Sequence, residues 1–305
     1  MAANLEEFLL SPAVWQPQSS GAAVRLKHAL GPLGVYTAGS TLLRTQWEAG
    51  GGKLPTHLID LTAIPGLDRI AVQNGELIIG ATARLNDCSS HPVVMERAPL
   101  LADAIRQIAG WSVRNQATLG GNAASRVGDA VPALLALDAC LVWHDGEKQY
   151  TEHIAEWLSV QNWPGMLEWV ETRDTIGLRL LTSIRIPLPD EYTTKQTRRW
   201  FAYHKAGRRE AFMPSLVTAA VAAEVGEDGA FADIRITAGG GRTVPLRLTE
   251  AERLLRGRRP EAAALRQVHE AVREQYVPEP DPFATDDYRK LTLANLIAAE
   301  LWKRK

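Results

Sequence analysis

The stretch Arg114–Asn122 reads R-N-Q-A-T-L-G-G-N, and it indicates the fold more strongly than any other part of the chain. A β-branched threonine, an apolar residue and two adjacent glycines predict a strand over Val113–Thr118 that ends in a sharp, open turn. Glycine has no Cβ, so its backbone can adopt positive φ and approach a ligand closely. N–H groups exposed in such a turn form a concave anion site that suits a diphosphate. On spacing alone, a plain turn without a ligand is the alternative.

The size and charge of the chain limit its class. Its 305 residues leave room for two or three domains. A formal net charge of −1, with 46% hydrophobic and 23% charged residues, is ordinary for a globular protein. Nucleic acid is therefore not expected as a partner, because no excess of basic residues is present to neutralise phosphates.

Targeting signals and cysteines point to the compartment. The first ten residues are acidic where a secretory signal would be basic, and no apolar run is long enough to span a bilayer. Two cysteines, Cys88 and Cys140, are too few for a disulfide framework or an iron–sulfur cluster. We therefore expect a cytoplasmic protein, and any iron–sulfur cluster must lie on another chain.

The hydrophobic pattern predicts strands, turns and helices in the first two thirds of the chain. A strand at Val35–Ala38 runs into the turn Gly39–Thr41, and a helix follows at Leu42–Glu48. Strand, small-residue turn and helix in this order commonly hold a phosphate at the helix N-terminus. Asn74-Gly75 between two apolar runs predicts a β-hairpin. Asp129 is expected to cap the next helix.

The pattern changes after the proline-rich and polar segment Pro187–Arg198, which predicts a linker. Three strands and then three helices follow, at Trp200–Lys205, Ser215–Val225, Phe231–Ala238, Thr249–Arg256, Glu261–Tyr276 and Tyr288–Arg304. This order predicts an α+β domain with a three-stranded antiparallel sheet.

No hydrolytic or metal-binding constellation is recognisable in the sequence. The seven histidines are scattered, without an H-E-x-x-H motif or a Cys/His pair at zinc spacing. The G-x-S-x-G, Walker A and G-x-G-x-x-G motifs are absent. We therefore assign no catalytic residue and no metal ligand, and expect a bound cofactor to supply any chemistry.

Several segments in order along the chain carry motifs of one family. They are Ala38–Leu42 (like A-G-G-x-S/D-L), Leu58–Leu67 (L-I-D-L-x-x-I-P-x-L), Ile78–Thr82 (I-G-A-x-T), Val113–Asn122 (I-R-N-x-x-T-I-G-G-N), Leu180–Pro187 (L-L-T-x-I-x-I-P), Tyr203–Arg209 (F-x-K-x-x-R-R) and Pro245–Arg247 (P-x-R). Together they resemble the FAD-binding (medium) subunits of the molybdenum hydroxylases, such as xanthine dehydrogenase and carbon monoxide dehydrogenase. The resemblance covers nearly the whole chain.

This resemblance implies an α+β chain with a two-part FAD-binding fold, PCMH-like and CO dehydrogenase flavoprotein-like, before the C-terminal α+β domain. The expected boundaries are 1–57 for the first FAD-binding subdomain, 58–190 for the second and 191–305 for the C-terminal domain. FAD would lie in the cleft between the two FAD-binding parts.

The resemblance also assigns FAD contacts. Asp129 would meet the ribityl or ribose hydroxyls, and Leu181 and Lys205 would lie near the isoalloxazine, where a cation can stabilise a reduced, anionic flavin. Ile108 stands where some relatives place an aromatic residue against the ring. Without the resemblance, Lys205 would be interpreted as a surface lysine of a strand. The residues expected at the diphosphate are Ala38, Gly39, Ser40, Thr41, Leu42, Thr118, Leu119, Gly120, Gly121 and Asn122.

Two positions depart from the family pattern. Ser40 stands where a second glycine is common, and the segment from Asn122 to Asp129 is two residues shorter than usual. A serine can occupy a turn and donate a hydrogen bond. The shorter segment makes Ser125 an alternative to Asp129 for the ribose or ribityl contact.

The resemblance further implies partners. In the family, substrate is hydroxylated at a molybdopterin centre in a large subunit, and electrons pass through two [2Fe-2S] clusters in a small subunit to FAD. This chain would then be an oxidoreductase subunit that relays electrons to an acceptor such as NAD or oxygen. Two other interpretations stay open: a stand-alone flavoenzyme of related fold, and a subunit that has lost FAD and serves as a scaffold.

Overall fold

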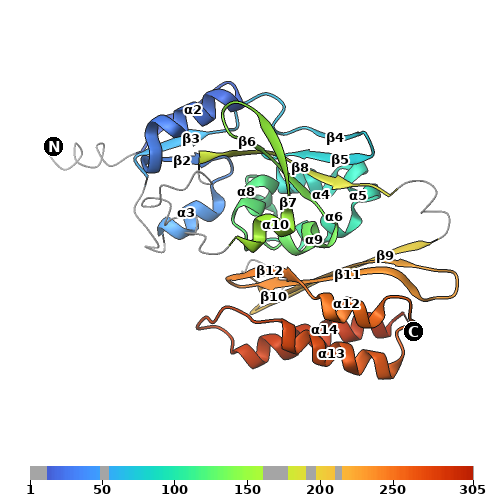
Figure 1. The fold of residues 1–305 in the computed structure, drawn as a ribbon. Helices are drawn as coiled ribbons and strands as arrows, with labels where there is room; N and C mark the ends of the chain where they lie inside the picture. The colour runs from blue at the N-terminus through green and yellow to red at the C-terminus, as the bar shows by residue number, and fades with distance from the viewer. Residues whose placement is uncertain (1–11, 49–54, 161–177, 190–196, 210–214, 305) are drawn as a thin grey trace.

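The computed structural model describes residues 12–48, 55–160, 178–189, 197–209 and 215–304. Within them are three sheets: a small parallel one, a five-stranded antiparallel one and a four-stranded antiparallel one. Figure 1 shows the four-stranded sheet between the helices of the N-terminal part and its own three helices. Among the described residues, no helix has the length and apolar character needed to cross a membrane.

The small sheet holds the first predicted strand–turn–helix unit. Its strands lie in the order β1-β3-β2, with bounds β1 (Ala13–Trp15), β2 (Gly34–Thr37) and β3 (His57–Asp60). Helix α2 (Ser20–Leu30), capped by the Ser19 hydroxyl, leads through the short 3-10 helix η1 (Gly31–Leu33) to β2. Helix α3 (Thr41–Glu48) follows β2, which confirms the predicted unit.

The five-stranded sheet forms the centre of the N-terminal part. Its order is β4-β5-β8-β6-β7, with bounds β4 (Ile70–Gln73), β5 (Glu76–Gly80), β6 (Cys140–His144), β7 (Gln149–His153) and β8 (Leu180–Pro187). The predicted hairpin is confirmed, because Asn74 and Gly75 join β4 to β5 with φ of 52° and 75°. Positive φ at both turn residues suits the right-handed twist of the two strands.

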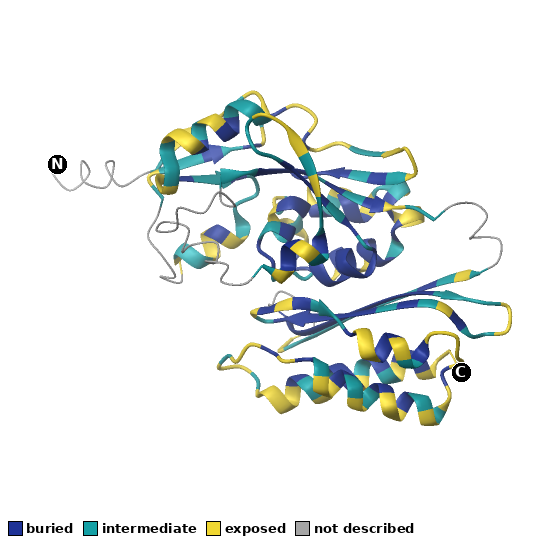
Figure 2. Ribbon diagram, viewed as in Figure 1, coloured by how far each residue is buried: buried dark blue, intermediate teal, exposed yellow. Residues whose placement is uncertain are grey.

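Among the described residues, seven short helices pack beside this sheet, and the largest cluster of buried apolar residues lies mainly between these two layers (Figure 2). Their bounds are α4 (Leu85–Ser90), α5 (Pro92–Arg97), α6 (Pro99–Arg106), α7 (Trp111–Arg114), α8 (Leu119–Ala124), α9 (Val131–Ala136) and α10 (Ile154–Ser159). The sheet contributes residues such as Leu77, Ile79 and Ile184 to this core, and Trp157 of α10 packs against Trp143 of β6.

The predicted strand over Val113–Thr118 is wrong. Its beginning belongs to α7, and Thr118 caps α8 by accepting a hydrogen bond from the Gly121 N–H at 3.1 Å. The two glycines therefore lie in the first turn of a helix and not in an open turn after a strand. A threonine is a strand former and also a good N-cap, so its presence does not distinguish the two structures.

The four-stranded sheet corrects the predicted count of three. Its order is β12-β11-β10-β9, with bounds β9 (Arg198–Gly207), β10 (Ser215–Val225), β11 (Phe231–Gly240) and β12 (Thr243–Arg247). The additional strand, β12, contains Pro245, which lacks an N–H and so argues against a strand in the sequence. β12 lies at the sheet edge and its pairing with β11 shifts register around Pro245, and edges and bulges are where a sheet tolerates proline.

The three predicted C-terminal helices are confirmed. They are α12 (Thr249–Leu255), α13 (Ala262–Gln275) and α14 (Asp286–Trp302), and they bury their apolar sides against one face of the four-stranded sheet. The other face meets α6 and α9 of the N-terminal part. Most of the predicted linker, residues 190–196, lies outside the described part of the chain, and the domain boundaries 1–57, 58–190 and 191–305 stay predictions.

Candidate functional site

Three segments that are far apart in the sequence meet backbone to backbone. A Cβ on Gly39 would lie 2.0 Å from the Gln116 carbonyl oxygen and 2.9 Å from the Ala117 Cα. A Cβ on Gly120 would lie 2.4 Å from the Ala81 carbonyl oxygen. Real Cβ atoms do not approach this closely, so both positions need glycine. The structure thus brings the predicted turn at 38–42 against Gln116 and Ala117, and the Ala81 segment against Gly120.

The first turn of α3 is the part of this assembly that can receive a ligand. Ser40 has φ of 52°, in the left-handed region that favours glycine, and its carbonyl accepts the first helical hydrogen bond from Arg44 at 2.9 Å. In the described part of the chain, the backbone N–H groups of Ser40, Thr41 and Leu42 have no acceptor. Unpaired N–H groups at the positive end of a helix dipole form an anion site.

The first turn of α8 differs, because the protein already satisfies its N–H groups. Leu119 and Gly120 each donate at 2.9 Å, to the carbonyl oxygens of Ala83 and Ala81. Gly121 donates to the Thr118 hydroxyl, and Asn122 donates to the Thr118 carbonyl at 3.0 Å. The predicted diphosphate contacts of Thr118–Asn122 are therefore not visible as free donors, and they stay a prediction.

Gly121 has no free N–H group, but the space beside its Cα atom is open. The glycine is exposed, and a Cβ added there would meet only the Thr118 hydroxyl oxygen, at 3.0 Å. This contrasts with Gly39 and Gly120, where backbone fills the same space. A phosphate group can approach a bare backbone closely, and the free N–H groups at the start of α3 suit the same kind of group, so the residues present fit a bound dinucleotide.

The short segment after α8 is braced by Asn122. The Asn122 Oδ1 accepts a hydrogen bond from the Ala130 N–H at 3.1 Å, and a Cβ on Gly128 would lie 2.3 Å from this oxygen. The Ser125 hydroxyl donates to the Asn122 carbonyl at 2.7 Å. Ser125, the alternative ribose contact, is thus turned into the segment itself, and its assignment to the cofactor stays untested.

Asp129 and Lys205 form an ion pair that joins the two parts of the molecule. Lys205 Nζ lies 2.7 Å from Asp129 Oδ2 and also donates to the Gln107 carbonyl at 3.0 Å. The predicted capping role of Asp129 is wrong, because α9 has Ala130 at its N-cap and no side-chain capping bond. The interpretation of Lys205 as a surface lysine is also wrong, since its side chain is only 8% exposed. Their proposed flavin contacts stay predictions.

The remaining predicted residues, Leu181 and Ile108, are both buried in the core beside the five-stranded sheet. Sequence reasoning missed two residues that hold Asp129: Ser215 and Tyr203. Tyr203 could have been found, because it lies two residues before Lys205 and so on the same face of β9. Ser215 has no such signal. Within the described ranges, no group of His, Cys, Asp and Glu side chains could hold a metal ion.

Arg114, the first residue of the quoted stretch, has a structural role. Its guanidinium donates to the carbonyl oxygens of Ile108 and Ala109 at 2.8 and 2.9 Å, just beyond the end of α6. It thereby fixes the chain between α6 and α7, and with it the start of the 116–120 segment.

Two family profiles together match almost the whole chain. The FAD binding domain in molybdopterin dehydrogenase matches residues 7–189, and the CO dehydrogenase flavoprotein C-terminal domain matches residues 201–302. The carbon monoxide dehydrogenase medium chain of Hydrogenophaga pseudoflava is 39% identical over 41% of this chain, but the match spans only 44% of that relative. The uncharacterized protein YgfM of Escherichia coli is 31% identical over 93% of each chain.

Solved structures show the same fold. A chain of carbon monoxide dehydrogenase from Hydrogenophaga pseudoflava superposes with a TM-score of 0.83, covering 96% of this chain and 98% of that one at 25% identity. A chain of quinoline 2-oxidoreductase from Pseudomonas putida superposes with a TM-score of 0.79, covering 95% of each at 20% identity.

Proposed function

The chain belongs to the family of FAD-binding medium subunits of the molybdenum hydroxylases, and from this premise we propose that it relays electrons through FAD to an external acceptor. The electrons would come from [2Fe-2S] clusters in a small partner subunit, which receives them from a molybdopterin centre in a large one. As an oxidoreductase subunit, the chain would contribute no acid, base or nucleophile of its own. A cytoplasmic location and an acceptor such as NAD or oxygen are part of this proposal.

The observation that carries the proposal is the meeting of three small-residue segments at an open helix N-terminus. Gly39, in the turn before α3, packs closely against the backbone of Gln116 and Ala117. The N–H groups of Ser40, Thr41 and Leu42 have no acceptor in the described part of the chain. Three free backbone N–H groups at a helix N-terminus can bind an anionic group such as a diphosphate.

In this proposal the described residues have separate tasks. The first turn of α3 holds the diphosphate, and the bare backbone of Gly121 leaves room for it. FAD held there would supply the uptake and release of electrons. Lys205 supplies a positive charge beside it, which favours the added negative charge of reduction. We therefore expect Lys205→Ala to change the flavin reduction potential more than the affinity for FAD.

The experiment is the visible absorption spectrum of the protein purified from its native host, with identification of the chains that co-purify. Flavin and iron–sulfur features together with two further subunits are the expected result. A flavin spectrum from a lone chain would replace the relay with a stand-alone flavoenzyme. A colourless protein bound to partners would replace it with a scaffold.

A further inference from the structure

Asp129 accepts hydrogen bonds from three side chains of the four-stranded sheet. Its Oδ2 accepts from Lys205 Nζ at 2.7 Å, its Oδ1 accepts from the Ser215 hydroxyl at 2.6 Å, and its backbone carbonyl accepts from the Tyr203 hydroxyl at 2.7 Å. Burial and the adjacent Asp129 charge both raise the pKa of Tyr203 well above its usual value, so this phenol stays a donor. Both carboxylate oxygens of Asp129 therefore have partners before any ligand arrives.

The backbone beside Asp129 is fixed as well. Asn122 Oδ1 holds the N–H of Ala130, the next residue, and Gly128 packs against the Asn122 side chain. The carboxylate is only 13% exposed. A buried ion pair is stable only when further hydrogen bonds support it, and here the Ser215 hydroxyl and the Gln107 carbonyl supply them. Asp129 thus has little freedom to turn toward a cofactor hydroxyl.

We propose that Asp129 is a positioning residue for Lys205: it holds the lysine ammonium in place and offsets part of its charge at the flavin. This inference rests on the proposed function, since it assumes that Lys205 lies near bound FAD. Asp129 then acts on the cofactor through Lys205 and not by touching the ribose or ribityl hydroxyls. The ammonium is fixed by two acceptors on the N-terminal part, Asp129 and the Gln107 carbonyl, although Lys205 itself belongs to β9.

Charge predicts opposite effects for the two members of the pair. Asp129→Asn keeps the shape, and its amide oxygen can still accept from Lys205 while its NH2 group donates to the Ser215 hydroxyl. It leaves the lysine charge uncompensated, so reduction of the flavin becomes easier. Lys205→Met removes the cation and leaves the carboxylate, so reduction becomes harder. If the ion pair only held the two parts of the molecule together, the two variants would not shift the flavin reduction potential in opposite directions, because both would weaken the same contact.

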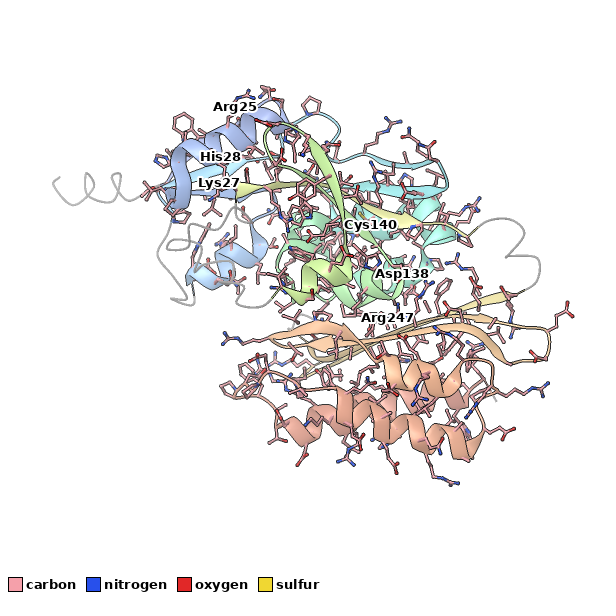
Figure 3. All side chains as sticks on the ribbon, viewed as in Figure 1. Arg25, Lys27, His28, Asp138, Cys140 and Arg247 are labelled. Atoms are coloured by element: carbon pink, nitrogen blue, oxygen red, sulfur yellow. The ribbon has the colours of Figure 1, made fainter. Side chains whose placement is uncertain are left out.

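Asp138 provides a matched control. It follows α9 as Asp129 precedes it, and it also ties the N-terminal part to the four-stranded sheet, through Arg235 at 2.9 Å and Arg247 at 3.4 Å (Figure 3). Asp138→Asn therefore removes an equivalent acidic contact without changing the partner of Lys205. If a shift in the flavin reduction potential came only from a weaker contact between the two parts, Asp138→Asn would show it as well.

The test is the midpoint reduction potential of FAD in the full-length chain for the wild type, Asp129→Asn, Lys205→Met and Asp138→Asn, with the thermal unfolding midpoint of each FAD-free protein. We expect the potential to rise in Asp129→Asn, to fall in Lys205→Met and to stay unchanged in Asp138→Asn, while both aspartate variants lower the unfolding midpoint.

Shifts of the same sign in the two pair variants, or no shift, would overturn the positioning role while leaving FAD binding intact. If Asp129→Asn lost FAD while Lys205→Met kept it, Asp129 would be a direct cofactor ligand, which also overturns the inference. Failure of the wild type itself to bind added FAD, seen as unquenched flavin fluorescence, would instead refute the proposed function.

Discussion

A Cβ atom on Gly39 would lie 2.0 Å from the carbonyl oxygen of Gln116. The turn that precedes α3 and the segment that precedes α8 are therefore in backbone contact, although Gly39 and Gln116 are 77 positions apart in the sequence (116 − 39). The glycine at this position allows two segments of the backbone to pack closely, and this contact sets the turn before the N–H groups of α3 that have no acceptor in the described part of the chain. Stability of the fold and formation of the site are linked at one residue.

Gly39→Ala should destabilise the protein even without a cofactor. The methyl group can be accommodated only if the backbone at Gln116 moves, and we expect a loss of about 3 kcal/mol or more in the free energy of unfolding. Urea unfolding of the FAD-free chain measures it. Gly21→Ala in α2 is the control: the nearest atom to its Cβ is the end of the Arg25 side chain at 3.3 Å, and alanine favours a helix. Equal stability of the two variants would contradict this account of Gly39.

Gly121→Val should abolish FAD binding and leave most of the fold intact. A Cβ there meets only the Thr118 hydroxyl, at 3.0 Å, so the branched side chain extends into the open face assigned to the diphosphate. FAD content per chain and far-ultraviolet circular dichroism separate the two effects. Gly121→Ala, with a smaller group, should reduce binding less. A Gly121→Val protein with normal FAD content would exclude this face as the cofactor site.

The sequence specified most elements because their signals are local. The hairpin at Asn74-Gly75 and the three C-terminal helices follow from turn residues and apolar periodicity. The strand over Val113–Thr118 failed because a threonine before two glycines satisfies the rules for a strand end and for a helix cap alike. β12 was missed because Pro245 is tolerated at a sheet edge where the pairing is irregular, and both features depend on the assembled sheet.

The sequence predicted candidate residues of the site but not the contacts between them. The motifs named Asp129 and Lys205, but their 2.7 Å contact depends on how the four-stranded sheet docks on α9, which no local pattern encodes. The same holds for Gly39, which the sequence presents as a ligand-facing glycine and the structure presents against Gln116. A position that a motif assigns to cofactor binding can thus require glycine because another backbone segment packs closely against it.

Arg114→Met should lower the stability of the chain by about 1–3 kcal/mol, because two carbonyl oxygens beyond the end of α6 lose a charged donor. Thermal unfolding of the FAD-free protein measures the change. Arg97→Met is a suitable control, since Arg97 is exposed and its ion pair in the described part of the chain is with its sequence neighbour Glu96, at 3.1 Å. If Arg114→Met unfolded at the temperature of the wild type but lost FAD, this arginine would be part of the cofactor site and not a brace.

The buried Lys27 should make stability depend on pH above neutrality. It lies on α2 between the exposed Arg25 and His28 (Figure 3), and its ammonium donates to the carbonyl oxygens of Gly31 at 2.9 Å and Gly34 at 2.5 Å. Burial lowers its pKa from 10.5 to about 8. Between these two values the unfolded chain binds a proton that the folded chain does not, so the Lys27 contribution to stability rises with pH through this window.

Comparison of the wild type with Lys27→Met isolates this effect. Burial also raises the pKa of Cys88, to about 12, which acts in the opposite direction above pH 9, but that group is common to both proteins and cancels in their difference. We expect the wild type to gain stability relative to Lys27→Met between pH 8 and 10.5, by at most about 1.4 kcal/mol per pH unit. Urea unfolding at pH 7.5, 8.5 and 9.5 measures it, with Arg25→Met as an exposed control. A difference that stays constant with pH would show that Lys27 keeps its proton in the fold.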